Sequence, residues 1–143
     1  MRKICFVCSG NTCRSPMAER LLKKHLKDLG VADVAVASMG LCVEPDAKVE
    51  PKAAAALKKY CINRASAKAK QISSKDLKKD ILFITMTAEQ KKAFGTFEYV
   101  FSIGELVGGE DVIDPYGCDQ EEYDKTAKML NDYTYKLAQI LKQ

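Results

Sequence analysis

The apolar run over residues 3–7 passes directly into a polar loop, and helical spacing begins at residue 15. The run is too short for an amphipathic helix and does not alternate, so it predicts a strand buried on both faces. Over residues 15–29 the apolar positions fall on one stripe, with Pro16 suited to the first turn and Gly30 to the end. A strand, a loop and a helix in this order open an α/β fold.

The same alternation of strands and helices continues along the chain. Further strands are expected at 34–37, 81–84 and 99–101, with a second helix at 51–60. Glycines at 104, 108 and 109 predict an irregular loop that runs to Asp114. A long final helix follows, with Asp119 and Glu122 as a capping box at its start. We expect a single α/β domain over residues 1–143, built on a doubly wound four-stranded parallel sheet with helices on both faces.

The composition excludes several classes of protein. With 143 residues, 47% hydrophobic and 29% charged, the chain has the make-up of one soluble globular domain. No stretch is apolar for long enough to span a membrane, and the first apolar run is too short for a secretion signal. The net charge of +4 comes without an aromatic-interleaved basic module, which argues against nucleic-acid binding. We expect a cytoplasmic monomer whose six cysteines are free thiols.

The loop after the first strand has the features of a phosphate-binding site. It reads Cys8-Ser9-Gly10-Asn11-Thr12-Cys13-Arg14-Ser15 and lies where backbone N–H groups and a helix dipole converge on an anion. Gly10 and Asn11 readily take the positive φ that a tight loop requires. Arg14 can hold two phosphate oxygens, and its charge favours the thiolate form of Cys8. Ser15 can donate its hydroxyl to that thiolate, so Cys8 is the candidate nucleophile.

These cysteines have two other interpretations. A buried structural cysteine before an ordinary polar loop is the plain alternative, but the order strand, Cys, five residues, Arg, Ser, helix is more specific. Cys5 and Cys8 have the C-x-x-C spacing of redox and zinc sites. Cys5 falls inside the strand, however, and a zinc site needs further ligands where His25 is the single histidine. We expect no metal, and we take His25 as a packing or surface residue.

At these residues the chain resembles the low-molecular-weight protein tyrosine phosphatase family. The resemblance covers nearly the whole length and rests on three segments besides the C-x5-R-S loop. They are Pro16-Met17-Ala18-Glu19, Ser38-Met39-Gly40 where the family has a Ser-Ala-Gly turn, and Asp114-Pro115-Tyr116-Gly117 where it has its acid loop. The resemblance implies a phosphatase that forms a phosphocysteine intermediate, needs no metal or cofactor, and has phosphorylated proteins or peptides as partners.

The resemblance also implies roles for residues outside the loop. Asp114 alone would be a turn residue, but in the family it protonates the leaving group and later takes a proton from water. Tyr116 would form one wall of the substrate cleft, and Leu41 with Cys42 the other. The family has a cysteine at the position of Cys13 that can form a disulfide with the nucleophile, which is a reversible inactive state.

One position departs from the family pattern. Members commonly carry a histidine after the second helix that hydrogen-bonds the loop asparagine, and the alignment puts Ala67 at that position. The resemblance therefore assigns no partner to Asn11, whose strained conformation needs support from its surroundings.

Thr12 bears on which phosphate is bound. Tyrosine-directed members of the family generally have Ile there, while members with Thr resemble the bacterial protein arginine phosphatases. A hydroxyl can accept a guanidinium N–H, which an aliphatic chain cannot. We therefore favour phosphoarginine, with a general tyrosine phosphatase as the alternative. Three acidic residues lie in loops expected near the cleft, namely Glu44, Asp46 and Asp119. Each is consistent with attraction of a guanidinium and equally with a role on the solvated surface.

Two further functions stay open at this point. Arsenate reductases that share the loop need a pair of closely spaced downstream cysteines, and only Cys61 and Cys118 remain there. A non-hydrolytic oxyanion-binding or phosphocarrier module would hold phosphate on Cys8 without hydrolysing it. Such a carrier has no use for Asp114, so this residue separates the two classes.

Overall fold

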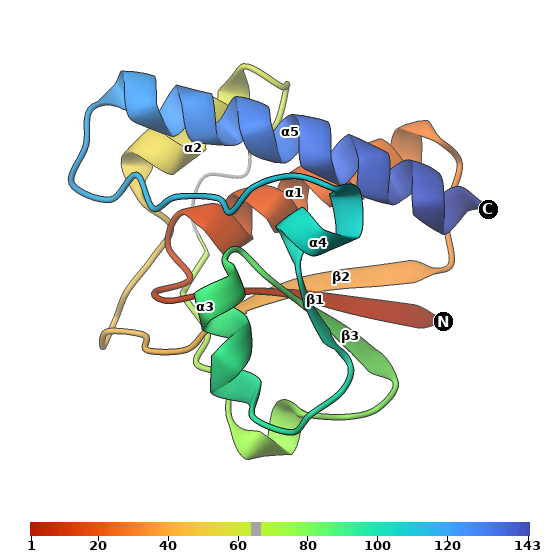
Figure 1. Ribbon diagram of the computed structural model, residues 1–143. Helices are drawn as coiled ribbons and strands as arrows, with labels where there is room; N and C mark the ends of the chain where they lie inside the picture. The colour runs from red at the N-terminus through yellow and green to blue at the C-terminus, as the bar shows by residue number, and fades with distance from the viewer. Residues whose placement is uncertain (64–66) are drawn as a thin grey trace.

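The computed structural model describes residues 1–63 and 67–143. Within them, four strands form one parallel sheet in the order β2-β1-β3-β4, and helices lie on both of its faces (Figure 1). The strands are β1 (Arg2–Cys8), β2 (Val34–Gly40), β3 (Ile81–Thr85) and β4 (Val100–Ser102). The helices are α1 (Arg14–Asp28), α2 (Pro51–Lys58), α3 (Ala88–Lys91), α4 (Ile103–Val107) and α5 (Gln120–Lys142), with 3-10 turns η1 (Ser74–Asp76) and η2 (Lys92–Phe94).

Strand β1 lies in the middle of the sheet, and this sets the position of the loop that follows it. Cys8 pairs in register with Gly40 of β2, while Val7 pairs with Thr85 of β3. The chain goes from β1 to β2 on one side and returns to β3 on the other. The carboxyl end of β1 is thus a topological switch point, the place where open α/β sheets bind their ligands.

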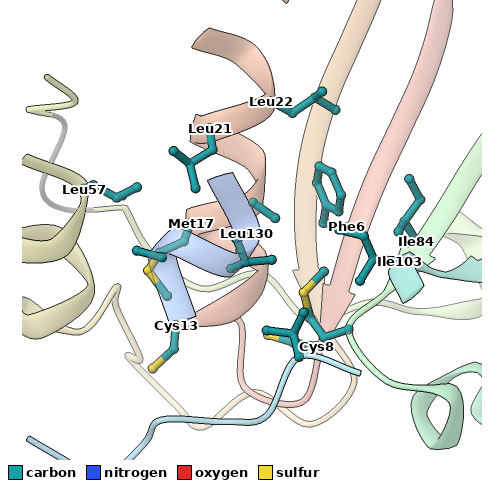
Figure 2. Close-up of a cluster of buried hydrophobic side chains, with 14 of the residues drawn as sticks. Phe6, Cys8, Cys13, Met17, Leu21, Leu22, Leu57, Ile84, Ile103 and Leu130 are labelled. Atoms are coloured by element: carbon teal, nitrogen blue, oxygen red, sulfur yellow. The ribbon is translucent and has the colours of Figure 1, made fainter. Parts of the chain in front are cut away.

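Alternate side chains of β1 enter two separate cores. Ile4, Phe6 and Cys8 lie in the larger cluster, which is covered by α1, α2 and α5 (Figure 2). Cys5 and Val7 lie in the smaller cluster on the other face, with aromatic rings such as Phe83. This burial on both faces is why the strand reads as an apolar run without alternation.

Most of the predicted elements are confirmed, with bounds that shift by a few residues. The predicted helices at 15–29 and 51–60 are α1 and α2, and all four predicted strands are present. The loop expected from the glycines at 104–109 was partly wrong, because Ser102 caps a short helix, α4, that ends at Gly108 with φ of 72°. Helix α3, capped by Thr87, was not predicted. At the start of α5, one of the two bonds of the predicted capping box is present, because Asp119 accepts the N–H of Glu122 at 3.1 Å.

Two smaller expectations are corrected. Ser38, Met39 and Gly40 belong to strand β2 rather than to a turn. Gly10 keeps a negative φ, and within the phosphate-binding loop only Asn11 takes a positive one, 55°. His25 is a packing residue, buried with its ring 5.4 Å from that of Tyr135 in an edge contact.

No helix in the described part of the chain has both the length and the apolar character needed to cross a bilayer.

Candidate active site

Residues 8–15, hereafter the phosphate loop, connect the end of β1 to the first turn of α1. Cys8 is buried, and its Sγ lies 2.8 Å from the Oγ of Ser15. Cys8 and Cys13 both lie at the carboxyl end of the strands, beside the start of α1 (Figure 2). The structure therefore brings the predicted nucleophile and the predicted hydroxyl into contact at the amino end of a fifteen-residue helix.

Asn11 is held by three hydrogen bonds. Its Oδ1 accepts the backbone N–H of Lys70 at 2.9 Å, which fixes the orientation of the amide. Its Nδ2 then donates to Ser15 Oγ at 2.8 Å and to Ser38 Oγ at 3.0 Å. These bonds use both N–H donors of the side chain and explain how a non-glycine residue stays at positive φ. They also answer the question that the absence of the family histidine left open.

The bond from Asn11 decides where the Ser15 proton goes. Because an amide Nδ2 can only donate, Ser15 Oγ accepts from Asn11, and its own proton is free to point at Cys8 Sγ. The same argument applies to Ser38, whose hydroxyl accepts from Asn11 and donates to Glu19 Oε1 at 2.6 Å. Donation therefore runs outward from Asn11 in both directions, through Ser15 to Cys8 and through Ser38 to Glu19.

Close packing holds the loop from its outer side. A Cβ on Gly40 would lie 2.9 Å from the carbonyl oxygen of Ser9 and 3.0 Å from Asn11 Cβ, so only glycine fits there. Gln90 of α3 donates from Nε2 to Ser9 Oγ at 3.3 Å. The loop therefore rests against both β2 and the segment that follows β3.

Arg14 is buried behind the loop and points toward the segment before α5. Its Nη1 donates to the carbonyl of Val112 at 3.0 Å, and its Nη2 lies 3.6 Å from Asp114 Oδ2. Its Nε is buried and has no hydrogen-bond partner among the described residues. An N–H buried without a partner is costly, and an oxyanion held by the loop would satisfy it.

Residues 113–118, hereafter the acid loop, stand at the solvent side of this site. Asp114 Oδ1 accepts the backbone N–H of Tyr116 at 3.1 Å, so the aspartate also makes the turn expected from its sequence. Its side chain is 47% exposed, and the neighbouring Ile113 and Tyr116 are exposed at 79% and 66%. The carboxylate is therefore at the mouth of the site, beside Arg14.

The buried cysteines differ in their surroundings. Cys13 Sγ lies 3.5 Å from the hydroxyl of Tyr123 on α5. Burial raises the pKa of the Cys13 thiol, and hydrogen bonds with Tyr123 and Thr12 oppose part of this rise. Burial raises the pKa of Cys5 to about 12, and this side chain lies on the opposite face of β1 from Cys8. Cys5 and Cys8 thus do not form a C-x-x-C pair.

The residues predicted to line the cleft differ in how exposed they are. Thr12 is half-buried, with its Oγ1 3.7 Å from Cys13 Sγ. The backbone N–H groups of Leu41 and Cys42 donate to the carbonyls of Cys8 and Ser9 at 2.9 and 2.8 Å. The Leu41 side chain packs against the smaller core, whereas Cys42 is exposed.

Several of these contacts join residues far apart in the sequence, and sequence reasoning missed them. Lys70, Gln90 and Val112 belong to no motif, and Glu19 was noted only as part of a family motif, without a role. Ala67 lines a small cavity of about 60 Å³ together with Asn11 and Ser38. No pattern in the sequence links these residues to Asn11. Ser38 was noted only as part of a motif, without a partner.

Comparison with known proteins agrees with this geometry. Residues 3–143 match the family model described as "Low molecular weight phosphotyrosine protein phosphatase". A protein-arginine-phosphatase of Bacillus subtilis (strain 168) is 36% identical, over an alignment that covers 98% of this chain and 97% of the relative. The low molecular weight protein-tyrosine-phosphatase PtpB of Staphylococcus haemolyticus (strain JCSC1435) is 34% identical, with 90% and 91% covered.

A solved structure shows the same fold and bears on the chemistry. It is a mutant of the arginine phosphatase YwlE with a phosphorylated active-site serine, superposing with a TM-score of 0.90 at 34% identity over 99% of this chain and 96% of that one. The parallel sheet with the loop after its first strand is shared. The chain belongs to the low molecular weight phosphotyrosine protein phosphatase family, and it is a phosphatase.

Proposed function

We propose that this chain is a single-domain protein phosphatase that hydrolyses phosphoarginine through a phosphocysteine intermediate on Cys8. The observation that carries the proposal is the convergence of Cys8, Arg14 and Asp114 at the end of β1. The sulfur lies 2.8 Å from Ser15 Oγ, and the Arg14 guanidinium lies 3.6 Å from the Asp114 carboxylate. A nucleophile, a cation and an acid thus meet at one anion-binding helix terminus.

In the first step, the Cys8 thiolate attacks the phosphorus and forms the S–P bond. The backbone N–H groups of residues 9–15 and the Arg14 guanidinium hold the phosphoryl oxygens, and the unpartnered Nε supplies one of the donors. The P–N bond to arginine, or the P–O bond to tyrosine, breaks as the Asp114 carboxylic acid gives its proton to the leaving atom. The product leaves and the phosphate stays on sulfur.

In the second step, water attacks the phosphocysteine while the Asp114 carboxylate takes a proton from it. The S–P bond breaks, inorganic phosphate forms, and Cys8 departs as thiolate. The Ser15 hydroxyl, directed at Cys8 by Asn11, stabilises the negative sulfur. The phosphorylated serine of the YwlE mutant supports attack from this position of the fold.

The choice of phosphoarginine is supported by Thr12 and by the arginine phosphatase relatives. Thr12 is half-buried in the loop, where its Oγ1 can accept an N–H of the substrate guanidinium. An isoleucine at this position would instead pack on a phenol ring. The second candidate is a general tyrosine phosphatase, which the likeness to PtpB favours.

The test is the ratio of kcat/KM for matched phosphoarginine and phosphotyrosine peptides, measured for the parent and for Thr12→Ile. The substitution exchanges a hydrogen bond worth about 1.5–3 kcal/mol for ring contact. The ratio should therefore shift by about tenfold to a hundredfold toward phosphotyrosine, at 1.4 kcal/mol per decade. A parent that already prefers phosphotyrosine, or a ratio that does not move, would make the chain a general tyrosine phosphatase.

The phosphocysteine mechanism has its own test in Cys8→Ser. We expect this variant to lose hydrolysis of an aryl phosphate while it still binds phosphate or vanadate, because the loop donors are unchanged. Turnover that survives the substitution would refute the mechanism. The same experiment excludes a phosphocarrier if the parent releases inorganic phosphate in many turnovers per chain.

A further inference from the structure

We propose that the carboxylate of Glu50 is a specificity-determining group, which binds the cationic guanidinium of a phosphoarginine substrate. The inference rests on the proposed phosphoarginine activity and names a residue that no motif contains. The acidic residues considered from the sequence were Glu44, Asp46 and Asp119, and Glu50 was not among them.

Glu50 is fixed beside the residue that we expect to select the substrate. Its backbone N–H donates to the carbonyl oxygen of Thr12 at 2.9 Å, across 38 positions of the chain. The residue is half-buried, so it lies at an edge of the loop and not on a free surface. The backbone of Glu50 therefore lies directly against the loop residue whose side chain we expect to meet the leaving group.

The fold itself does not use the Glu50 carboxylate. Glu50 is the N-cap of α2, followed by Pro51, but its side chain makes no capping hydrogen bond. Within residues 1–63 and 67–143, it also takes part in no side-chain hydrogen bond or salt bridge. Ser, Thr, Asn and Asp are the usual N-caps because their short side chains reach the N–H groups of the first turn. A glutamate here is a poor cap, so helix stability does not explain the residue.

Two carboxylates act on the same end of the phosphate loop. The pKa of Cys13 is raised by burial and further by the negative charges of Asp114 and Glu50. The pKa of Tyr123, which is raised by burial and by its contact with Cys13, also rises further through Glu50 and Asp114. Asp114 comes from the acid loop and Glu50 from the start of α2, so two different elements bring negative charge near this end of the phosphate loop.

This arrangement distinguishes two substrates by their charge. Phosphoarginine carries a cationic guanidinium next to its phosphoryl group, and a carboxylate beside Thr12 attracts it. Phosphotyrosine has the same phosphate but a neutral ring in place of the guanidinium, so the carboxylate gives it no such attraction. Lys52, two residues after Glu50, places its ammonium at the acid loop, where Nζ donates to the carbonyl of Cys118 at 2.6 Å. Among the described residues it forms no ion pair with Glu50.

The closing experiment compares Glu50→Gln with Glu98→Gln. Both variants remove one negative charge, but Glu98 is an exposed residue just before β4, at the opposite end of the sheet from the loop. For Glu50→Gln we expect kcat/KM on a phosphoarginine peptide to fall about threefold to tenfold, through KM, because the guanidinium is cationic before and during reaction. On a phosphotyrosine peptide it should stay constant or rise. Glu98→Gln should leave both substrates unchanged.

Two further measurements separate the possible results. Raising the salt concentration should shrink the difference between parent and Glu50→Gln, since the interaction is electrostatic, and Glu50→Asp should recover part of the loss. If the parent prefers phosphoarginine but Glu50→Gln changes neither substrate, or lowers both equally with a lower melting temperature, the role of Glu50 is refuted. If the parent prefers phosphotyrosine, the proposed function fails first, whatever Glu50 does.

Discussion

The phosphate loop and the acid loop meet at one site but are built in opposite ways. In the phosphate loop, Asn11, Cys13 and Arg14 are buried almost completely. In the acid loop, Ile113 and Tyr116 are among the most exposed apolar side chains of the chain, and the Asp114 side chain is half exposed. One side of the site is thus part of the core, and the other is part of the surface.

The two loops also differ in how their polar groups are held. Asn11 alone receives or makes bonds to α1, β2 and the segment at Lys70. The acid loop is held near its two ends, where the preceding Val112 donates its N–H to the carbonyl of Met86 and Lys52 donates to the carbonyl of Cys118. A rigid cradle suits a phosphoryl group that is the same in every substrate. An exposed acid suits a leaving group that differs from one substrate to the next.

The largest expected effect tests how rigid the phosphate loop is. Mild peroxide should inactivate the enzyme completely by joining Cys8 and Cys13, with two thiols oxidised and peroxide reduced to two molecules of water. Both side chains lie at the same end of β1 and α1 (Figure 2), and both are free. Mass spectrometry of the peptide that contains both should show two hydrogens lost, and dithiothreitol should restore activity.

The matched variant for the oxidation experiment is Cys13→Ser. Without the second thiol, we expect peroxide to carry Cys8 on to an irreversible sulfinic acid, so that dithiothreitol no longer rescues activity. Sulfinic acid on Cys8 in the parent, formed as quickly as in the variant, would show that the loop does not let the two sulfurs meet.

The next largest effect belongs to the acid loop. Asp114→Asn should slow hydrolysis by about 10²–10⁴-fold, the usual contribution of a general acid. Asparagine can keep the hydrogen bond to the Tyr116 N–H and loses only the half-exposed charge contact with Arg14, so the melting temperature should fall slightly. Rates on aryl phosphates with good and poor leaving groups provide the check. Near-normal turnover of the poorest leaving group would remove Asp114 from the mechanism.

The sequence predicts these two regions to different degrees. The strand, the order of residues in the phosphate loop and the start of α1 follow from local pattern, because burial on both faces and a helix start leave a local signature. The support of Asn11 does not, since its partners come from positions 15, 38 and 70. The approach of Glu50 to Thr12 is likewise a backbone contact that no side-chain pattern encodes.

A third prediction concerns that support. Asn11→Ala removes three hydrogen bonds and leaves a residue with a Cβ at a φ of 55°. With about 1 kcal/mol for each bond and about 1–2 kcal/mol for the positive φ, the free energy of unfolding should fall by about 4–5 kcal/mol. Asn11→Gly keeps the backbone unstrained and should recover the φ part only. Urea denaturation of the three proteins measures this, and equal stabilities for Ala and Gly would mean that strain contributes nothing.

The smallest effect is expected at the stem of the acid loop, in Tyr133→Phe. The Tyr133 hydroxyl accepts the N–H of Glu110 at 2.8 Å and donates to the carbonyl of the same residue at 3.2 Å. Its removal should cost about 1 kcal/mol of stability and lower kcat a few-fold with KM unchanged, because the acid is less well placed while the phosphate cradle is intact.

Tyr135→Phe is the control, since its half-exposed ring packs on His25 and its hydroxyl makes no hydrogen bond among the described residues. The loss should be greater for poor leaving groups than for good ones. A loss that is equal for all leaving groups, or that also raises KM for phosphate esters, would mean that the two loops are not independent and would undo the contrast between them.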